Sequence, residues 1–196
     1  MSIIHDPHDL SALFSYLEQY APLSSGYKQA YLGRAQLLKI KRSKFILSPL
    51  DNNACMYYII KGALRGFVKN KKKDITTFLS FENEFIGAIR HPNVQEAQSH
   101  EYIQALEDCE LIAIPYDLID HLYETFPETN IIGRKWLALQ YYNASDRAIL
   151  ARIPAATERY SMLLEKKGKE LDRIALRYLA SYLGMRSETL SRIRNK

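Results

Sequence analysis

The C-terminal stretch of the chain, residues 173–196, contains six Lys or Arg residues and a single acid, Glu188. Glu188 would lie in the first turn of a helix, where it could either complement the helix dipole or accept a hydrogen bond from the amino group of cytosine. Arginine is a preferred ligand of guanine and phosphate. The residues around Glu188 read IALRYLASYLGMRSETLSRIRNK, 174–196.

The spacing of apolar residues in this stretch predicts two short helices joined by a tight turn. The first has an apolar face at i, i+3, i+4 and i+7, made of Leu176, Leu179, Ala180 and Leu183. Gly184 follows, where a turn needs a positive φ. The second helix opens at Ser187 and would turn Leu190 and Ile193 to the core. This pattern favours a helix-turn-helix that reads the major groove of DNA; the alternative is a helical hairpin that only packs.

The charge distribution also points to an anionic partner for the C-terminal third. The net charge of +5 divides into −3 over residues 1–129 and +8 over residues 130–196. Nine of the fourteen cations in the second part are arginine. Such a basic segment on an acidic remainder is typical of nucleic-acid binding.

Upstream, short β-rich runs between polar turns predict an antiparallel barrel or sandwich. A helical pattern over 8–30 precedes these runs, and the charged residues 70–74 would form a hairpin turn. The expected strands are Ala35–Ile40, Lys44–Leu47, Met56–Ile60, Ala63–Val68, Ile75–Ser80, Tyr102–Leu106 and Glu110–Ile114.

The later segments are predicted to be helical, beginning with Tyr116–Thr125. A long helix follows over 128–152, with a seven-residue seam that includes Ile132, Leu139, Tyr142 and Ile149. The seam predicts either a dimer coiled coil or a helix packed on its own barrel. A further helix is expected over Ala155–Lys166, with Pro154 at its first position, and then a charged loop over 166–172.

Composition argues for a globular protein without a membrane span. The chain has 196 residues, is 47% hydrophobic and has two isolated cysteines, Cys55 and Cys109. No apolar run is long enough to cross a bilayer, the N-terminus has no basic signal-peptide region, and the cysteines suit a reducing cytoplasm. We therefore expect a cytoplasmic protein.

The order of barrel, long helix and helix-turn-helix resembles the CRP/FNR family of bacterial transcription regulators. The likeness rests on residues 57–87, 128–152 and 176–194. It implies an α+β chain with a cyclic-nucleotide-binding-like sensor domain (1–127, an antiparallel β-roll of jelly-roll type), a dimerisation helix (128–152) and a helix-turn-helix domain (153–196). It implies a homodimer on near-palindromic DNA, with RNA polymerase as a further candidate partner and an effector that is unknown.

The resemblance assigns Glu188 and Arg192 to base contacts and Thr189 to the phosphate backbone. Arg186 occupies the usual N-cap of the second helix, a role that Ser187 could take instead. The chain ends near this helix, so the family's β-hairpin wing would be truncated and affinity would depend more on the remaining cations. The full expected DNA-binding set is Arg177, Arg186, Ser187, Glu188, Thr189, Ser191, Arg192, Arg194 and Lys196.

The barrel departs from the family members that bind cyclic AMP. Those members have a glutamate after the barrel glycine and an Arg-Ser pair for the phosphate. Here Ala88 follows Gly87, and the pair reads Ser99-His100. A cyclic phosphate without its arginine loses a charge-assisted partner. We therefore expect no usual cyclic AMP binding, although Arg90 lies near enough in sequence to substitute.

The sequence gives little support for a metal site, a cofactor or an enzymatic activity. The five histidines, which include His91 and His100, are scattered and form no metal-ligand pattern, so we expect no metal and no cofactor. No motif for an enzyme is present. The remaining alternative is a barrel that binds a small ligand and signals through protein contacts, with the C-terminal helices as a docking surface.

Overall fold

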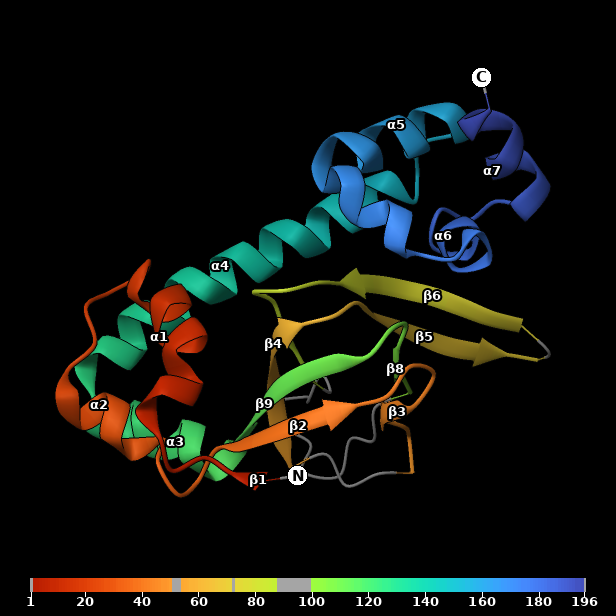
Figure 1. Cartoon of the computed structure of the whole chain (residues 1–196). Coiled ribbons are helices and arrows are strands. Elements are labelled where there is room, and N and C mark those ends of the chain that lie inside the picture. The colour runs from red at the N-terminus through yellow and green to blue at the C-terminus, as the bar shows by residue number, and fades with distance from the viewer. Residues whose placement is uncertain (1, 51–53, 72, 88–99, 196) are drawn as a thin grey trace.

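The computed structural model describes residues 2–50, 54–71, 73–87 and 100–195 and consists of two antiparallel sheets flanked by helices (Figure 1). The five-stranded sheet has the order β1-β2-β9-β4-β7, and the four-stranded sheet has the order β3-β8-β5-β6. The strands are β1 (Ser2–Ile3), β2 (Gln36–Ile40), β3 (Phe45–Leu47), β4 (Cys55–Lys61), β5 (Leu64–Asn70), β6 (Lys73–Ser80), β7 (Phe85–Ile86), β8 (Tyr102–Ala105) and β9 (Cys109–Pro115).

The predicted α+β fold with an antiparallel β-roll is confirmed. All seven strands expected from the sequence are present, and the hairpin pairs Asn70 of β5 with Lys73 of β6. The two strands that were not predicted, β1 and β7, have only two residues each, too few for an alternating pattern.

Strand β9 lies between two hydrophobic clusters, which explains its unbroken apolar run. Leu111 packs inside the barrel, with Ile59 and Leu64. Ile112 and Ile114 point the other way, into a cluster beneath the N-terminal helices. Because successive side chains of a strand alternate, a strand covered on both faces must be apolar at every position.

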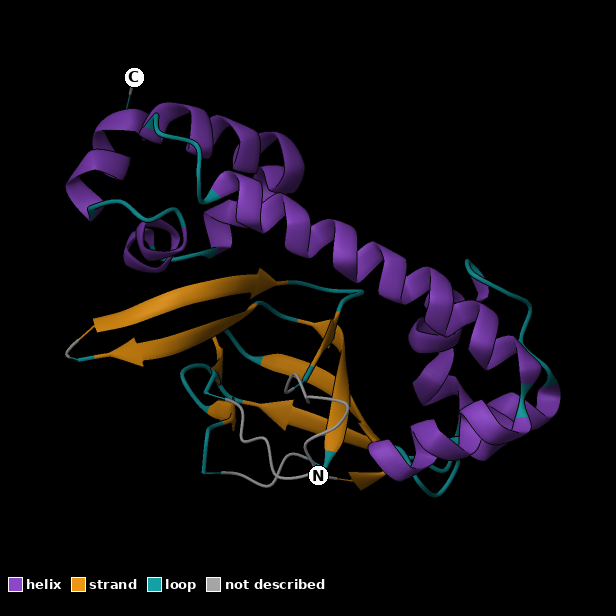
Figure 2. Ribbon diagram, turned by 180° about the vertical axis from the view of Figure 1, so that it is seen from behind, coloured by secondary structure: helices purple, strands orange, loops and turns teal. Residues whose placement is uncertain are grey.

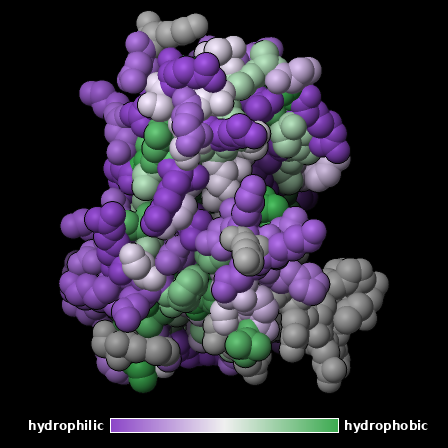
Figure 3. Space-filling view, turned by 90° about the vertical axis from the view of Figure 1, so that its right-hand side faces the viewer, coloured by the Kyte–Doolittle hydropathy of each residue, from purple (hydrophilic) through white to green (hydrophobic). Residues whose placement is uncertain are grey.

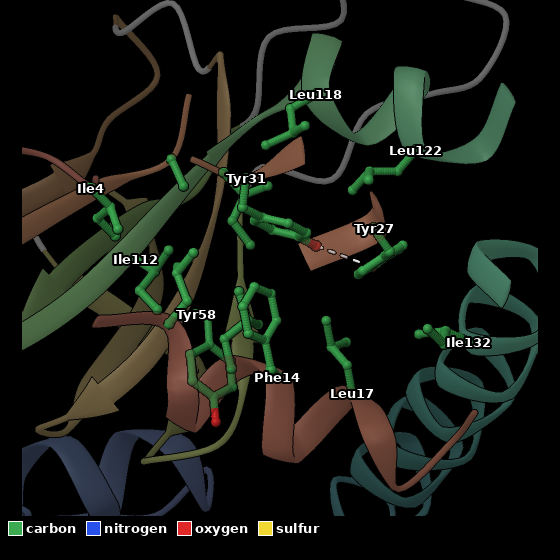
Figure 4. Packing of buried hydrophobic residues seen from close by; sticks show 14 of the residues in the cluster. Ile4, Phe14, Leu17, Tyr27, Tyr31, Tyr58, Ile112, Leu118, Leu122 and Ile132 are labelled. Carbon is green, nitrogen blue, oxygen red and sulfur yellow. Dashed lines mark hydrogen bonds between the residues drawn. The ribbon is translucent and has the colours of Figure 1, made fainter. Parts of the chain in front are cut away.

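The N-terminal helices cover one end of the barrel. They are η1 (Pro7–Leu10), α1 (Ser11–Glu18) and α2 (Ser25–Ala30), so the continuous pattern expected over 8–30 is divided into three pieces. Figure 4 shows Phe14 and Leu17 of α1 pointing toward Tyr27 and Tyr31, whose hydroxyls are 3.1 Å apart. The remaining wall comes from α3 (Tyr116–Thr125) and the first turns of α4 (Pro127–Leu150).

Helix α4 joins the two ends of the molecule (Figure 2). Its first turn has Pro127 at a favourable position, and Ile132 is buried among the N-terminal helices with only 6% of its surface exposed. The predicted seam is therefore wrong at Ile132, which faces its own barrel. Leu139, Tyr142 and Ile149 of the predicted seam are exposed. Beside them lies an exposed row one residue earlier in the repeat, along Ile131, Ala138, Tyr141, Ser145 and Ala148.

The C-terminal helices form a compact unit above β6 (Figure 1). They are α5 (Ala156–Lys167), η2 (Gly168–Arg173), α6 (Leu176–Tyr182) and α7 (Ser187–Arg194). Two expectations are corrected here. Residues 168–173 form a 3-10 helix instead of a loop, and α5 begins after an N-cap at Ala155, so Pro154 precedes the helix. None of the helices described here is long and apolar enough to cross a membrane.

Candidate nucleic-acid interface

Helices α6 and α7 are joined by the glycine turn that the sequence predicts. Gly184 has φ of 63°, a conformation that costs glycine little. The N–H of Met185 donates to the carbonyl of Ala180 at 3.0 Å, and the N–H of Gly184 donates to that of Ser181 at 3.2 Å. These two bonds satisfy the last carbonyls of α6 in a Schellman motif. The turn thereby sets the direction in which α7 leaves α6.

The outer face of α7 is polar and the inner face is apolar. Leu190 is fully buried with Leu179 and Leu183 of the neighbouring helix and its turn, so it fixes the rotation of α7. Glu188 and Arg192 are exposed on the other side. Both base-reading candidates therefore face outward from one helix side, one turn apart.

The N-terminus of α7 begins at an N-cap without a side-chain hydrogen bond. Arg186 is that N-cap, in an extended backbone conformation, and Ser187 is the first helical residue. The unused N–H groups of the first turn can therefore face an anion such as a phosphate. Ser187, Thr189 and Ser191 are half-buried along the helix flank.

The other expected DNA ligands are placed differently. The guanidinium of Arg194 donates to Asp172 at 3.1 Å and is thus engaged within its own domain. Arg177 lies on α6, where it donates to the Tyr178 hydroxyl at 2.6 Å and lies 4.5 Å from that ring. Lys196 lies outside the described residues.

Sequence reasoning missed Arg159, which holds the turn from behind. Its guanidinium donates to the carbonyl of Leu183 at 2.8 Å and to that of Ile153 at 2.5 Å. It therefore ties α5 and the α4–α5 connection to the residue just before Gly184. Only the fold brings these carbonyls together, so the sequence holds no signal for this role.

The helix-turn-helix is docked on the barrel through Arg65, a residue that sequence reasoning also missed. Arg65 is only 3% exposed, and its guanidinium lies 4.1 Å from the ring centre of Phe67 and 3.9 Å from that of Tyr178. It donates to Asp74 at 2.9 Å and to Gln104 at 3.0 Å. A barrel cation is thus held between a barrel ring and a ring of α6.

A second interdomain contact is ionic. Arg173 of η2 donates two hydrogen bonds to Glu82 and also contacts Glu107, both on the barrel. This hydrogen bonding lowers the pKa of Glu82 to about 2. Lys167 at the end of α5 pairs with Glu84 at 2.6 Å. The barrel and the C-terminal helices are therefore held together by several charges as well as by Phe81 and Leu79, which lie in the C-terminal hydrophobic cluster.

The candidate ligand pocket of the barrel is described only in part. Ala88, Arg90 and Ser99 lie outside the described residues. Gly87 lies close to Tyr116, since a Cβ at this glycine would be 3.0 Å from the Tyr116 hydroxyl, and His100 is exposed. Among the residues with described positions, no three His, Cys, Asp or Glu side chains gather as metal ligands.

The candidate dimer helix exposes apolar side chains on the side away from the barrel. Leu139, Tyr142 and Ile149 are each exposed, and Tyr141 is 80% exposed. In contrast, Asp146 of the predicted seam is partly covered and pairs with Lys166 of α5.

Comparison with known proteins identifies the fold. No family model and no curated protein sequence matches the chain. Solved structures do match, among them the c-di-GMP responsive global regulator CLP of Xanthomonas campestris, with 17% identity, a TM-score of 0.68 and coverage of 88% of this chain and 90% of that one. FixK2 of Bradyrhizobium japonicum matches at 18% identity and a TM-score of 0.67, over 82% of this chain and 83% of its own.

A third match is a CRP/FNR-family protein of Eubacterium rectale, at 15% identity and a TM-score of 0.70 over 92% of this chain and 86% of the other. These matches span nearly the whole chain, so they include the barrel, the long helix and the C-terminal helices together. The chain therefore has the fold of the CRP/FNR transcription regulators.

Proposed function

We propose that the protein is a sequence-specific DNA-binding transcription regulator of the CRP/FNR type. The observation that carries this proposal is α7, which buries Leu190 while Arg186, Glu188 and Arg192 remain exposed on its outer side. The side chains that the proposed base and phosphate contacts require are therefore accessible, and they lie beside a helix N-terminus whose N-cap side chain makes no hydrogen bond. The shared fold with known regulators supports the same conclusion.

In this proposal, α7 enters the major groove with its N-terminal end toward the bases. Glu188 accepts a hydrogen bond from a cytosine amino group, and Arg192 donates to guanine or to a phosphate. Arg186 and the free N–H groups of the first turn bind the backbone. Ser187, Thr189 and Ser191 are close enough to the same face to add backbone contacts.

A homodimer is the second part of the proposal. The exposed row of α4 places small residues, Ala138, Ser145 and Ala148, beside the large apolar ones, Tyr141 and Ile149. A second copy of the helix can approach closely over the small side chains and cover the large ones. Two-fold symmetry would then place two α7 helices about 34 Å apart, on a near-palindromic site.

The barrel is proposed as a sensor whose ligand differs from cyclic AMP. This rests on the sequence, because Ala88, Ser99 and His100 replace the glutamate and the Arg-Ser pair that the family uses for that ligand. A ligand would act by changing the relative stability of two poses of barrel, long helix and DNA domain. We further propose that the protein acts in the cytoplasm, without enzymatic activity.

The experiment that tests the function is selection of bound fragments from a random duplex DNA pool. The wild-type protein is compared with Arg192→Ala and with a matched control, Arg34→Ala, whose arginine pairs with Asp117 of α3. We expect an enriched near-palindrome for the wild type and the control, and its loss for Arg192→Ala. One lost bidentate base contact should cost about 1–3 kcal/mol in discrimination.

The selection is run both with and without cell extract, which supplies an effector if one is needed. If a DNA site is enriched only when extract is present, the protein needs an effector to bind DNA. An absence of enrichment under both conditions would refute sequence-specific reading and favour a barrel that signals through protein contacts.

A further inference from the structure

The turn that joins β5 to β6 presents a row of lysines to solvent. Lys69, Lys71 and Lys73 are all exposed. Lys69 lies 4.4 Å from the ring centre of Tyr102, which holds its side chain on the barrel. Lys71 and Lys73 pair with no carboxylate of the described residues. Two cations at the tip of this hairpin are therefore available to an anionic partner.

The hairpin is fixed to α6 of the helix-turn-helix, so its position relative to α7 is defined. Ser181 of α6 accepts a hydrogen bond from the N–H of Thr76 at 3.0 Å and donates to the carbonyl of Asp74 at 3.1 Å. Asp74 is the residue next to Lys73, and Ser181 lies one turn before Gly184. Arg65 adds its contact with Tyr178 to the same junction.

The hairpin tip and α7 lie on the same side of the molecule. In Figure 1, the hairpin ends of strands β5 and β6 lie on the right, as does α7, with α6 between them. Figure 3 views this side, and hydrophilic side chains cover much of its upper and middle part. Arg177 of α6 lines one surface hollow with Lys69 and Asp74 of the hairpin, and Arg186, the N-cap of α7, is exposed.

The charge on this side is strongly positive. Asp74 lies closest to the tip, and its carboxylate is already paired with Arg65. Glu188 is the acid of α7, and in the proposed function its carboxylate accepts a hydrogen bond from a cytosine amino group. Phosphate groups are the anions that DNA would bring to the flank of α7.

We propose that Lys71 and Lys73 of the β5–β6 hairpin bind backbone phosphates of the DNA flanking the segment read by α7. The inference rests on the proposed function and extends it, because it makes the sensor barrel itself a DNA contact. It also couples the conformation of the barrel to DNA binding, because a barrel rearrangement that moved β6 would move these lysines relative to α7.

The test measures the salt dependence of DNA affinity. The variant Lys71→Gln/Lys73→Gln is compared with Lys28→Gln/Lys39→Gln, which removes the same charge from α2 and from the other sheet. Affinities are measured between about 50 and 200 mM salt, on the selected operator and on random duplex DNA. Each lost phosphate contact should reduce the slope of log affinity against log salt by about 0.9.

We expect the hairpin variant to lose roughly 2 from this slope per protomer on both DNAs while it keeps the wild-type sequence preference. Phosphate-ethylation interference should lose the protected positions that flank the α7 contacts. If the hairpin and control variants give equal slopes of log affinity against log salt, the inference is wrong. The two lysines would then be candidates for binding an acidic protein partner instead. The random duplex distinguishes failure of the hairpin proposal from failure of the proposed sequence-specific function, because it reports phosphate contacts even when no operator is selected.

Discussion

The docking of helices α6 and α7 on the barrel should depend on Arg65, and replacing it is the most informative perturbation of the fold. Arg65→Met keeps most of the side-chain volume but removes the charge that lies between Phe67 and Tyr178. A desolvated cation–π contact contributes about 2 kcal/mol. The Arg65 side chain is 4% exposed, so its contact with Tyr178 belongs in this class.

The loss of stability in Arg65→Met is limited, because the groups that Arg65 contacts can form new interactions with water. Asp74 loses its cation, but its side chain is 42% exposed and regains water. We therefore expect Arg65→Met to reduce the free energy of unfolding by about 2 kcal/mol, which is mainly the lost cation–π contact. The matched control Lys39→Met removes a 3.6 Å surface pair with Glu110 and should cost less than about 1 kcal/mol.

A double-mutant cycle isolates the interdomain part of this effect. Arg65→Met, Tyr178→Leu and the double variant are unfolded in urea and followed by circular dichroism. The coupling energy between the two sites should be about 2 kcal/mol, the value of one desolvated cation–π contact. A coupling below about 0.5 kcal/mol would refute the view that this stack holds α6 on the barrel.

Three further outcomes are expected. Leu190→Ala should destabilise the C-terminal helices by about 2–5 kcal/mol, because a fully buried leucine leaves a cavity, and urea unfolding measures this. The pKa of Glu82 is about 2 in the fold against an ordinary 4.5, so its bond to Arg173 stabilises the fold above about pH 4.5 and is lost as the pH falls toward 2. Glu82→Gln should therefore flatten the dependence of unfolding free energy on pH in that window, whereas an unchanged slope would contradict the assignment. Tyr141→Glu, on the exposed row of α4, should convert a dimer to a monomer in sedimentation equilibrium, and an unaltered mass would exclude this row as the seam.

The sequence came closest where local patterns alone decide structure. The strands, the hairpin turn at residues 70–74 and the glycine turn at Gly184 depend on alternation, polar turn residues and a positive φ, and all are present in the fold. Leu179, Ala180, Leu183 and Leu190 are buried as their spacing predicts. The charged outer face of α7 follows directly, because a helix that buries Leu190 must turn Glu188 and Arg192 away.

The long helix marks the limit of this reasoning. Helix α4 has apolar residues on two faces, one buried on its own barrel and one exposed, so periodicity could not assign them. Packing against the N-terminal helices buries Ile132 on the barrel side, whereas Leu139, Tyr142 and Ile149 of the same predicted seam remain exposed. The turn at Gly168 and the 3-10 helix after it likewise depend on how Leu171 packs under the C-terminal unit.

By itself, the sequence determined the order of elements, the helix-turn-helix and the basic character of the C-terminal third, since each depends on residues near one another in the chain. Only the tertiary structure decided how that unit is joined to the barrel. Arg65, Glu82 and Arg159 find partners far away in the chain: Arg65 contacts Tyr178, Glu82 binds Arg173 91 positions away, and Arg159 binds Leu183 24 positions away. No periodicity encodes such contacts, because they form only once separate elements have packed.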